Sequence, residues 1–225
     1  MTNRSPVRKQ IHDRDTFHAF MAEGMKFGDW DMPVIEPEPR VPTKLVPFSV
    51  AVSKSHTSRE GFVHFCEDDG DFERFWKNPR KYLPRLIEFD GAISPDFSTC
   101  SDMPIPLAIW NTYRNQLCGA WLQRQGVHVI PLVRMVEHVA PVTLAGIPRH
   151  APIAVCARGS VRNPEKRSLF VRTLKRTVDT LRPARIIWYG SDAHGIAEYP
   201  RSLGIPVITY PARGRGNLDG GTYER

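Results

Sequence analysis

Five short apolar runs constrain the fold of this chain more than any other feature of its sequence. They are Ala92 to Ser94, Val127 to Val133, Ile153 to Ala157, Ile186 to Tyr189 and Val207 to Tyr210. Helical or loop segments separate them, and strands that are apolar on both sides and alternate with helices are typical of a covered parallel sheet. We therefore predict an α/β fold with a mostly parallel sheet and helices on both faces. It is either an open sheet or a partial TIM-like barrel.

The segments before these runs indicate further elements. Phe48 to Ser53 and Phe62 to Phe65 are rich in β-forming residues and predict two strands, with a hairpin as one arrangement. The segment DFERFWKNPRKYLPRLIEF spaces its aromatic and leucine residues as a helix does, and Asn78-Pro79 divides it into two short helices. A third helix is expected over Asn163 to Leu181, because Asn163-Pro164 provides an N-cap followed by a proline at the first helical position.

Length and proline content suggest one domain with extensions at both ends. The chain has 225 residues, of which 41% are hydrophobic, so it can bury one sizeable core. Residues 31 to 47 include five prolines and should be extended or irregular. We predict an N-terminal arm and proline-rich linker over 1–47, a single α/β domain over 48–212, and a flexible basic tail over 213–225. In that tail, Arg213-Gly214-Arg215-Gly216 could wrap a phosphate.

The charge of the chain is positive, with 31 Lys and Arg against 24 Asp and Glu and a formal net charge of +7. This balance favours an anionic partner such as a nucleotide, a phosphate ester or nucleic acid, although a solvated basic surface has the same composition. The four cysteines are widely separated and form no CxxC pair, so their spacing indicates neither a zinc site nor a disulfide framework. The sequence names no cofactor, and the oligomeric state is left open.

Neither a secretory core nor a segment of membrane-spanning length is recognisable in the sequence. Together with cysteines that fit reduced thiols, this predicts a cytoplasmic protein without a membrane partner, in the host cell cytoplasm if a phage encodes it.

Polar residues follow the apolar runs, at the places where ligands bind in open parallel sheets. Arginine follows three of the five runs, and its fixed fork of donors suits phosphate or carboxylate. Glycine with serine follows two, which permits a close backbone approach to an anion. The predicted ligand-binding residues are Ser98, Asn111, Arg114, Arg134, Arg158, Ser160 and Ser191.

Two carboxylates in the first of these loops, Asp96 and Asp102, are the catalytic candidates. Prolines and small residues fix the loop, so both could lie near one cleft and bind a metal or act as acid and base. The metal itself is not specified. Alternatively, Asp96 caps a turn, and Asp102 caps the helix that follows Pro104, which is the better interpretation for Asp102.

The helix expected over Leu107 to Gln125 is apolar nearly all round, with a polar patch of Asn111, Arg114 and Asn115. Such a helix is largely buried, and buried polar groups need partners. Arg114 therefore either pairs internally, with Asp96 or Asp102 as candidates, or faces a ligand. The segment lacks any dinucleotide-binding GxGxxG or phosphate-binding Walker pattern, as does the rest of the chain.

Several segments in order resemble a known family. They are FERFWKNPRKYLPRL, FDGAISPDFSTCSDMP, IWNTYRNQLCGAWLQRQGVHVIP, GIPRHAPIAVCARGS and IIWYG, which cover roughly Phe72 to Gly190. They are similar to an uncharacterised family of bacterial, prophage and phage proteins, domain of unknown function 4417. The resemblance implies a protein of mobile genetic elements and no particular catalytic residue. This chain departs from its relatives at Arg134-Met135, where they tend to have a Ser-Trp pair.

Three functional hypotheses follow, and whether the protein is an enzyme stays open. The first is a small α/β protein that binds or acts on a phosphorylated or nucleotide-like ligand at the carboxyl ends of the strands. The second is a non-catalytic nucleic-acid-binding accessory protein that uses the basic face of the helix over Asn163 to Leu181. The third is a phage protein that interacts with a host partner through its arm or an exposed patch.

Overall fold

The structure, a computed structural model, describes residue 15 and residues 17–212. Seven strands lie in this range, and every ladder between them is parallel. They are β1 (Leu45–Pro47), β2 (Phe62–His64), β3 (Gly91–Ile93), β4 (Val129–Ile130), β5 (Pro152–Cys156), β6 (Arg185–Tyr189) and β7 (Val207–Tyr210). The predicted α/β fold with a parallel sheet is confirmed.

The strands form two sheets in which neighbours in sequence are neighbours in space. The first sheet has the order β1-β2-β3-β4 and the second has the order β5-β6-β7. A single parallel bridge between Leu132 and Ala154 connects the end of one sheet to the start of the other. Within the described residues no ladder joins β7 back to β1, so the sheets are open and do not close into a barrel.

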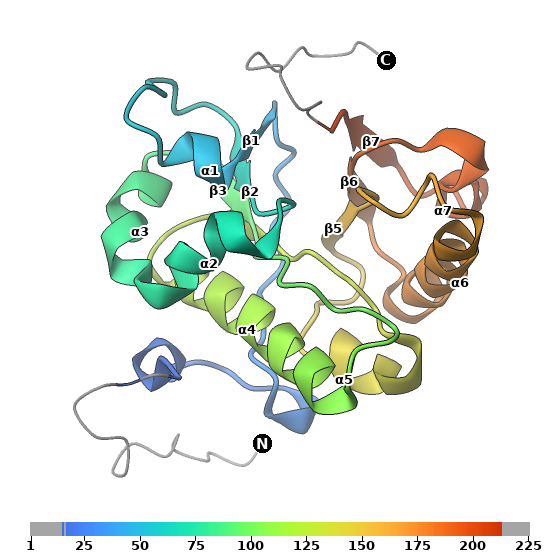
Figure 1. Ribbon diagram of the computed structural model, residues 1–225, viewed down its shortest axis with the longest axis horizontal. Coiled ribbons are helices and arrows are strands. Elements are labelled where there is room, and N and C mark those ends of the chain that lie inside the picture. The colour runs from blue at the N-terminus through green and yellow to red at the C-terminus, as the bar shows by residue number, and fades with distance from the viewer. Residues whose placement is uncertain (1–14, 16, 213–225) are drawn as a thin grey trace.

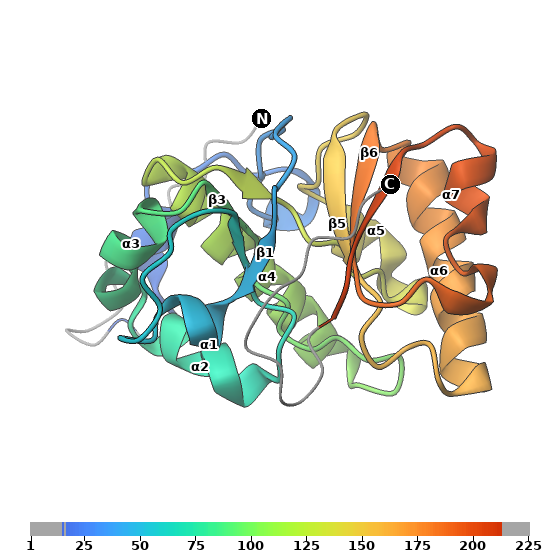
Figure 2. The same ribbon diagram turned by 90° about the horizontal axis from the view of Figure 1, so that it is seen from above.

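Helices flank the strands from two sides. They are α1 (Phe48–Ala51), α2 (Asp69–Lys77), α3 (Pro79–Ile87), α4 (Ile105–Arg124), α5 (Ala140–Leu144), α6 (Pro164–Leu181) and α7 (Glu198–Ser202). Short 3-10 turns are η1 (Ala19–Ala22), η2 (Asp29–Asp31), η3 (Glu137–Val139) and η4 (Ala193–Gly195). Seen from above, α2 and α3 lie on one side of the strands and α6 and α7 on the other (Figure 1, Figure 2).

Burial divides the core into layers. One cluster lies between the first sheet and α1 to α4 and is rich in aromatic residues such as Phe48, Phe65 and Phe75. A second lies between the second sheet and α5 to α7. A central cluster, defined by Phe62, Ile93, Ile130, Ala154 and Ile187 with their neighbours, joins side chains from both sheets. Because side chains alternate along a strand, one face of each strand packs in the central cluster and the other face packs against helices.

The predicted helices are confirmed. Asn78 ends α2 and its side chain accepts a hydrogen bond from the backbone of Lys81 at the start of α3, and Asn163 caps α6 in the same way through Lys166. The helix α4 has an almost uniformly buried second half, as its apolar composition indicates. Side-chain caps therefore mark the starts of α3 and α6.

The prediction of a strand over Phe48 to Ser53, and of a hairpin with the next strand, is wrong. The strand β1 ends at Pro47, Phe48–Ala51 forms α1, and β1 pairs with β2 in parallel. At the start of α1 the Glu67 carboxylate accepts hydrogen bonds from the backbone and the hydroxyl of Ser49. This long-range cap satisfies a free helical N–H group, which outweighs the β propensity of the segment.

The region before the α/β body packs against it where the structure describes it. Met21 and Ala22 of η1 are buried in the same cluster as Trp121 of α4, and Ile35 is also buried. The first strand, β1, begins inside the segment predicted as a linker. The predicted phosphate-wrapping tail lies outside the described residues. Within the part of the chain that the structure describes, no helix is both long and apolar enough to cross a bilayer.

Candidate functional site

The carboxyl ends of adjacent strands bring together three of the predicted site residues. Asp96 follows β3, Arg134 follows β4 and Arg158 follows β5. Two cysteines, Cys66 after β2 and Cys156 at the end of β5, lie beside them. We call these five residues the strand-end site. In parallel sheets this edge is where ligands bind, because the loops there converge from several strands.

Asp96 and Arg134 form the centre of the strand-end site. Arg134 Nε donates to Asp96 Oδ1 at 2.8 Å and Nη2 donates to Asp96 Oδ2 at 2.6 Å. The Asp96 side chain is 5% exposed, whereas that of Arg134 is 29% exposed. The Asp96 charge raises the pKa of Arg134, so this guanidinium is charged at every accessible pH. Arg134 turns the edge that carries Nε and Nη2 toward the Asp96 carboxylate, and its Nη1 has no partner among the described residues.

The loop that carries Asp96 is fixed by α4 and α2. Asn115 clamps the next residue, because its Oδ1 accepts from the Phe97 N–H at 2.7 Å and its Nδ2 donates to the Phe97 carbonyl at 3.2 Å. Ser98 donates through its hydroxyl to Asp69 at 2.9 Å. On the other side of the loop, the Ser94 hydroxyl accepts from the Leu132 N–H at 2.8 Å. Asp96 is thus held by side chains from two helices, which keeps its carboxylate at one place.

Arg158 is the more exposed cation of the strand-end site. Its side chain is 42% exposed, and Nη1 donates to the Cys66 carbonyl at 3.2 Å. Its ion pair with Asp68 is longer, 3.5 Å from Nη2, and the Asp68 side chain is 75% exposed. Such a pair contributes little free energy and can be exchanged for another anion at small cost.

Two buried thiols, those of Cys66 and Cys156, lie beside Asp96 and the two arginines. The sulfur atoms of Cys66 and Cys156 and a carboxylate oxygen of Asp96 all lie within 4.8 Å of one another. Burial raises the pKa of Cys66, while a hydrogen bond from the Cys66 thiol lowers the pKa of Cys156. Sequence reasoning missed both residues, because they come from strands some ninety positions apart and have no spacing signature.

A histidine and a tyrosine complete this buried floor. His64 is the last residue of β2, and its Nδ1 accepts a hydrogen bond from the Cys66 N–H at 3.1 Å. Its ring contacts that of Tyr189 at the end of β6, with 4.2 Å between the ring centroids. Both side chains are buried. The only sequence signal for them is their position at the carboxyl end of an apolar run.

Three other predicted ligand-binding residues, Ser98, Asn111 and Arg114, make contacts between the Asp96 loop, α2 and α4. Arg114 pairs with Glu73 at 3.4 Å and Asn111 at 2.7 Å, and its guanidinium lies 3.7 Å from the centroid of the Phe97 ring. The alternative of an internal pair is therefore confirmed for Arg114, but the suggested partners Asp96 and Asp102 are wrong, because the partner is Glu73 of α2. Asn111 donates to the Ser98 carbonyl at 2.6 Å, so Ser98 and Asn111 also hold the loop.

Among the described contacts, Ser160 and Ser191 make hydrogen bonds to residues nearby in the sequence, and Asp102 makes none. Asp102 is exposed and does not cap α4, because the N-cap is Pro104 and the early Pro106 removes one of the N–H groups that a cap would bind. The interpretation of Asp102 as a helix cap is therefore wrong. Ser160 donates its N–H to the Ala157 carbonyl, and the Ser191 hydroxyl accepts from the Ala193 N–H.

The basic face of α6 is partly neutralised. Arg172 donates to both carboxylate oxygens of Glu137 in η3, at 2.9 Å from Nη2 and 2.9 Å from Nε, and Arg176 lies 3.6 Å from the same carboxylate. These arginines hold the pKa of Glu137 below its usual value. The face therefore presents less positive charge than the sequence suggests.

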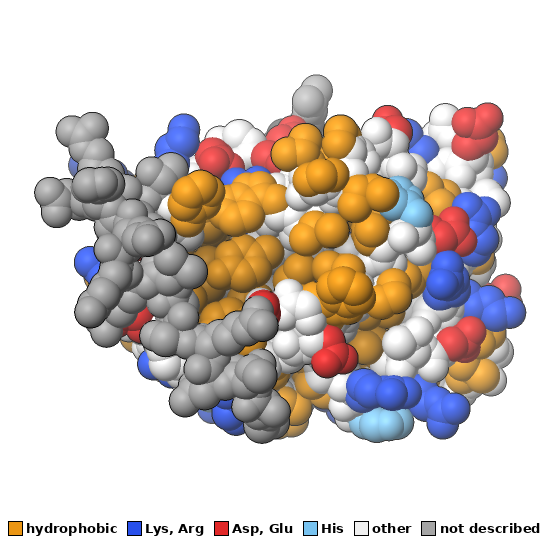
Figure 3. Space-filling model, turned by 90° about the horizontal axis from the view of Figure 1, so that it is seen from below, with side chains coloured by type: hydrophobic (Ala, Val, Ile, Leu, Met, Phe, Trp, Pro, Cys, Tyr) orange, Lys and Arg blue, Asp and Glu red, His pale blue; other side chains and the backbone are white. Residues whose placement is uncertain are grey.

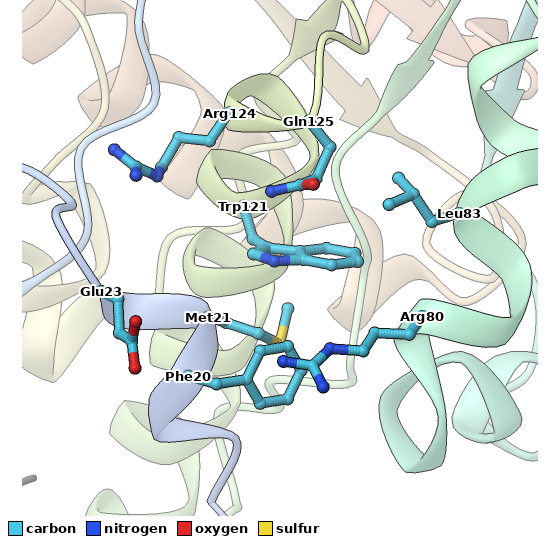
Figure 4. A pocket seen from close by; sticks show the side chains of 8 residues that line it. All are labelled: Phe20, Met21, Glu23, Arg80, Leu83, Trp121, Arg124 and Gln125. Atoms are coloured by element: carbon cyan, nitrogen blue, oxygen red, sulfur yellow. The ribbon is translucent and has the colours of Figure 1, made fainter.

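One hollow in the described part of the chain lies away from the strand-end site. It has a volume of about 400 Å³ and is lined by η1, α3 and the end of α4. Figure 4 shows the Trp121 ring at its centre, with Phe20 and Arg80 on one side and Arg124 and Gln125 on the other. Arg80 is stacked 4.1 Å from the Phe20 ring centroid, and Arg124 donates to the Gly24 carbonyl. Because its cations already have partners, this hollow is a weaker candidate for binding an anion than the strand-end site.

Comparison with known proteins identifies relatives among phage proteins. Residues 25–210 match the model of DUF4417, a domain of unknown function. The Gene 1 protein of Mycobacterium phage D29 is 31% identical over 163 residues, which cover 72% of this chain and 60% of the relative. The Gene 1 protein of Mycobacterium phage L5 is 28% identical over 180 residues, 76% of this chain and 79% of the relative. No solved structure matches the chain.

The class of protein follows from fold and relatives together: this is a phage-associated α/β protein with a parallel strand arrangement. Within that class, the chain belongs to the DUF4417 family, whose model spans nearly all of the described residues. The resemblance expected from the sequence is thereby confirmed.

Proposed function

We propose that this protein binds a small phosphorylated or nucleotide-like anion at the strand-end site, with Arg134 and Arg158 as its cationic contacts. The observation that carries the proposal is the gathering of two partly exposed guanidinium groups at the ends of β4 and β5. These strands are neighbours through the bridge between Leu132 and Ala154. Guanidinium groups suit the oxygens of a phosphate better than those of a neutral ligand.

The two arginines differ in what they offer an anion. Arg134 is compensated by Asp96, so its role is to present the remaining Nη1 donor from a fixed position. Arg158 brings the charge that is available for exchange, because its present acidic partner is the exposed Asp68 at 3.5 Å. We therefore expect Arg158 to contribute more free energy of anion binding than an equally exposed arginine elsewhere on the surface.

Asp96 fits an orienting role in this proposal rather than proton transfer. Both of its oxygens accept hydrogen bonds from Arg134, and a carboxylate repels an anion, so Asp96 positions the guanidinium and does not contact the bound anion. A carboxylate that acts as acid or base must reach the reacting proton within hydrogen-bonding distance. We therefore propose binding as the function and assign no reaction to it.

The test is a calorimetric titration with inorganic phosphate, pyrophosphate and the common nucleoside triphosphates. We expect one of these probes to bind the wild type and Arg158→Ala to weaken that binding roughly 10-fold or more, because a hydrogen bond to a charged group is lost. Arg149→Ala is the matched control, since Arg149 is exposed near the opposite, amino end of β5. Equal affinity of wild type and Arg158→Ala for every probe that binds would remove the proposal.

An exposed apolar face favours a second candidate, interaction with a protein partner. Figure 3 shows hydrophobic side chains gathered over the face seen from below. Among the described residues, large apolar side chains with high exposure include Trp30 at 66%, and Ile105 at 48% and Leu107 at 51% in the first turn of α4. Contiguous apolar surface of this kind often marks a binding site. A folded Leu107→Asp variant that still bound every host protein recovered by the wild type would argue against this candidate.

A further inference from the structure

The three buried ligand atoms of the strand-end site have the arrangement of a metal centre. The sulfur atoms of Cys66 and Cys156 and an Asp96 oxygen lie within 4.8 Å of one another, and all three residues are buried. Two sulfurs bound to one zinc ion at about 2.3 Å in tetrahedral geometry lie about 3.8 Å apart. Small side-chain rotations are therefore enough to place all three atoms around a single ion.

We propose that Cys66, Cys156 and Asp96 bind one zinc ion through two thiolates and one carboxylate oxygen. Thiolates select zinc over magnesium or calcium, and a mixed sulfur and oxygen set suits zinc better than copper(I). Three protein ligands leave the fourth tetrahedral position to water, which is the form of zinc sites that are open to a ligand. This site goes beyond the anion binding proposed above and does not depend on it.

The charge balance of the buried site permits a divalent cation. Without zinc, Asp96 and Arg134 compensate each other, and protonated thiols add no charge. When zinc enters, two thiol protons leave as the two sulfur–metal bonds form. The site gains two positive charges with the ion and two negative charges with the thiolates, so its net charge does not change. Burial of an uncompensated charge, which is very costly, is thereby avoided.

The surrounding groups already form the support that metal ligands need. Arg134 holds Asp96 through one lone pair on each oxygen, which leaves further lone pairs for a metal. The backbone of Arg158 makes a hydrogen bond to the Cys156 sulfur, and its side chain donates to the Cys66 carbonyl. Hydrogen bonds to ligating carboxylates and to ligand-bearing segments orient them and tune metal affinity.

The sequence contains matched control cysteines. Cys118 is buried in α4, where it belongs to the aromatic-rich cluster, and Cys100 is exposed. Neither is among the three residues of the proposed centre. Cys118→Ser removes an equally buried thiol elsewhere in the fold, so it separates loss of a metal ligand from a general effect of a buried hydroxyl.

The experiment is a zinc titration of the full chain after removal of metal under reducing conditions. We expect one equivalent of zinc to bind and two protons to be released. Cys66→Ser and Cys156→Ser should each weaken zinc binding more than about 100-fold, since the loss of a supporting hydrogen bond alone costs 10- to 100-fold. Cys118→Ser should bind as the wild type does. Cobalt should give a thiolate charge-transfer band that the first two variants lose.

Two measurements on the wild type decide the question even if a variant does not fold. X-ray absorption of the zinc-loaded protein should show two sulfur and two lighter neighbours, and a shell without sulfur would overturn the proposal. Alkylation in denaturant with chelator should find all four cysteines as free thiols. A count of two would instead establish a disulfide and overturn the zinc site, as would failure of the folded, reduced protein to bind zinc.

Discussion

At the scale of single residues, the Asp96–Arg134 pair is the contact on which the stability of the strand-end site depends most. Asp96→Asn keeps the shape of the side chain but removes its charge and turns an amide group toward the arginine donors. We expect a loss of about 2 to 3 kcal/mol in the free energy of unfolding. This is less than for a fully buried pair, because the Arg134 side chain is 29% exposed. Urea denaturation in a buffer with chelator measures the loss.

The control for this prediction is Asp102→Asn in the same loop. Asp102 is exposed and makes no capping contact with α4, so the change should stay within about 0.5 kcal/mol of the wild type. If both variants lost the same stability, the buried pair would not be the cause.

The partners of individual charged residues were the least predictable part of the site. The strand-end rule brought Asp96, Arg134 and Arg158 to one edge from the sequence alone, but it could not say that Asp96 pairs with Arg134. Arg114 shows why: its position in α4 faces Glu73 of α2, and that choice depends on how two helices pack. Pairing across 38 or 41 positions is a property of the tertiary structure rather than of local pattern.

At the scale of elements, the contact between α4 and β3 depends on a glycine. A Cβ atom on Gly119 would lie 2.7 Å from Ile35 Cδ1 and 2.9 Å from Ser94 Cβ. Gly119→Ala should therefore destabilise the fold by about 1 to 2 kcal/mol, since a clash of this kind exceeds the gain in helix propensity. Because Ser94 begins the loop of Asp96, the shift should also disturb the strand-end site.

Gly70→Ala in α2 is the matched change without a clash. No atom lies within 4 Å of the Cβ position at Gly70, so the alanine should stabilise the protein by roughly 0.5 to 1 kcal/mol through helix propensity alone. Thermal or urea denaturation of both variants gives the comparison. Stabilisation by both substitutions would show that α4 does not approach β3 as closely as described.

Elements with capping signals were predictable, and those defined by distant contacts were not. The helix α6 could be placed from Asn163-Pro164 and its one-sided apolar residues, because both signals are local. The segment Phe48 to Ser53 looked like a strand by composition, yet it forms α1 because Glu67, far along the chain, binds the N–H of Ser49. The amino-acid composition of the segment gives no information about that contact.

At the scale of the whole molecule, the parallel arrangement of the strands was predictable, but the meeting of Cys66 and Cys156 was not. Apolar runs alternating with helices indicate parallel strands, and right-handed crossovers with short connections leave few ways to order them. That Cys66 and Cys156 meet follows from β2 and β5 facing the same central cluster, although other strands separate them in the strand order. No spacing rule describes ligands that are contributed by three different strands.

Tyr210→Phe removes a hydrogen bond that joins the two ends of the strand series. The Tyr210 hydroxyl on β7 donates to the Pro42 carbonyl just before β1. Its loss should lower the free energy of unfolding by about 0.5 to 1.5 kcal/mol at neutral pH. A local contact of the same kind offers a control, because Ser202 donates to the Tyr199 carbonyl on the surface, and Ser202→Ala should have a smaller effect.

The pH dependence of stability tests whether the Tyr210 hydroxyl is buried in the folded state. Burial raises the pKa of Tyr210 to about 12, above the value near 10 of an unfolded tyrosine. The folded state therefore keeps the proton when the unfolded state loses it, so the stabilisation is complete below about pH 10 and declines as the pH rises through about 12. The difference in unfolding free energy between wild type and Tyr210→Phe should shrink over that range. A difference that stays constant would mean that the hydroxyl is not withdrawn from water in the folded state.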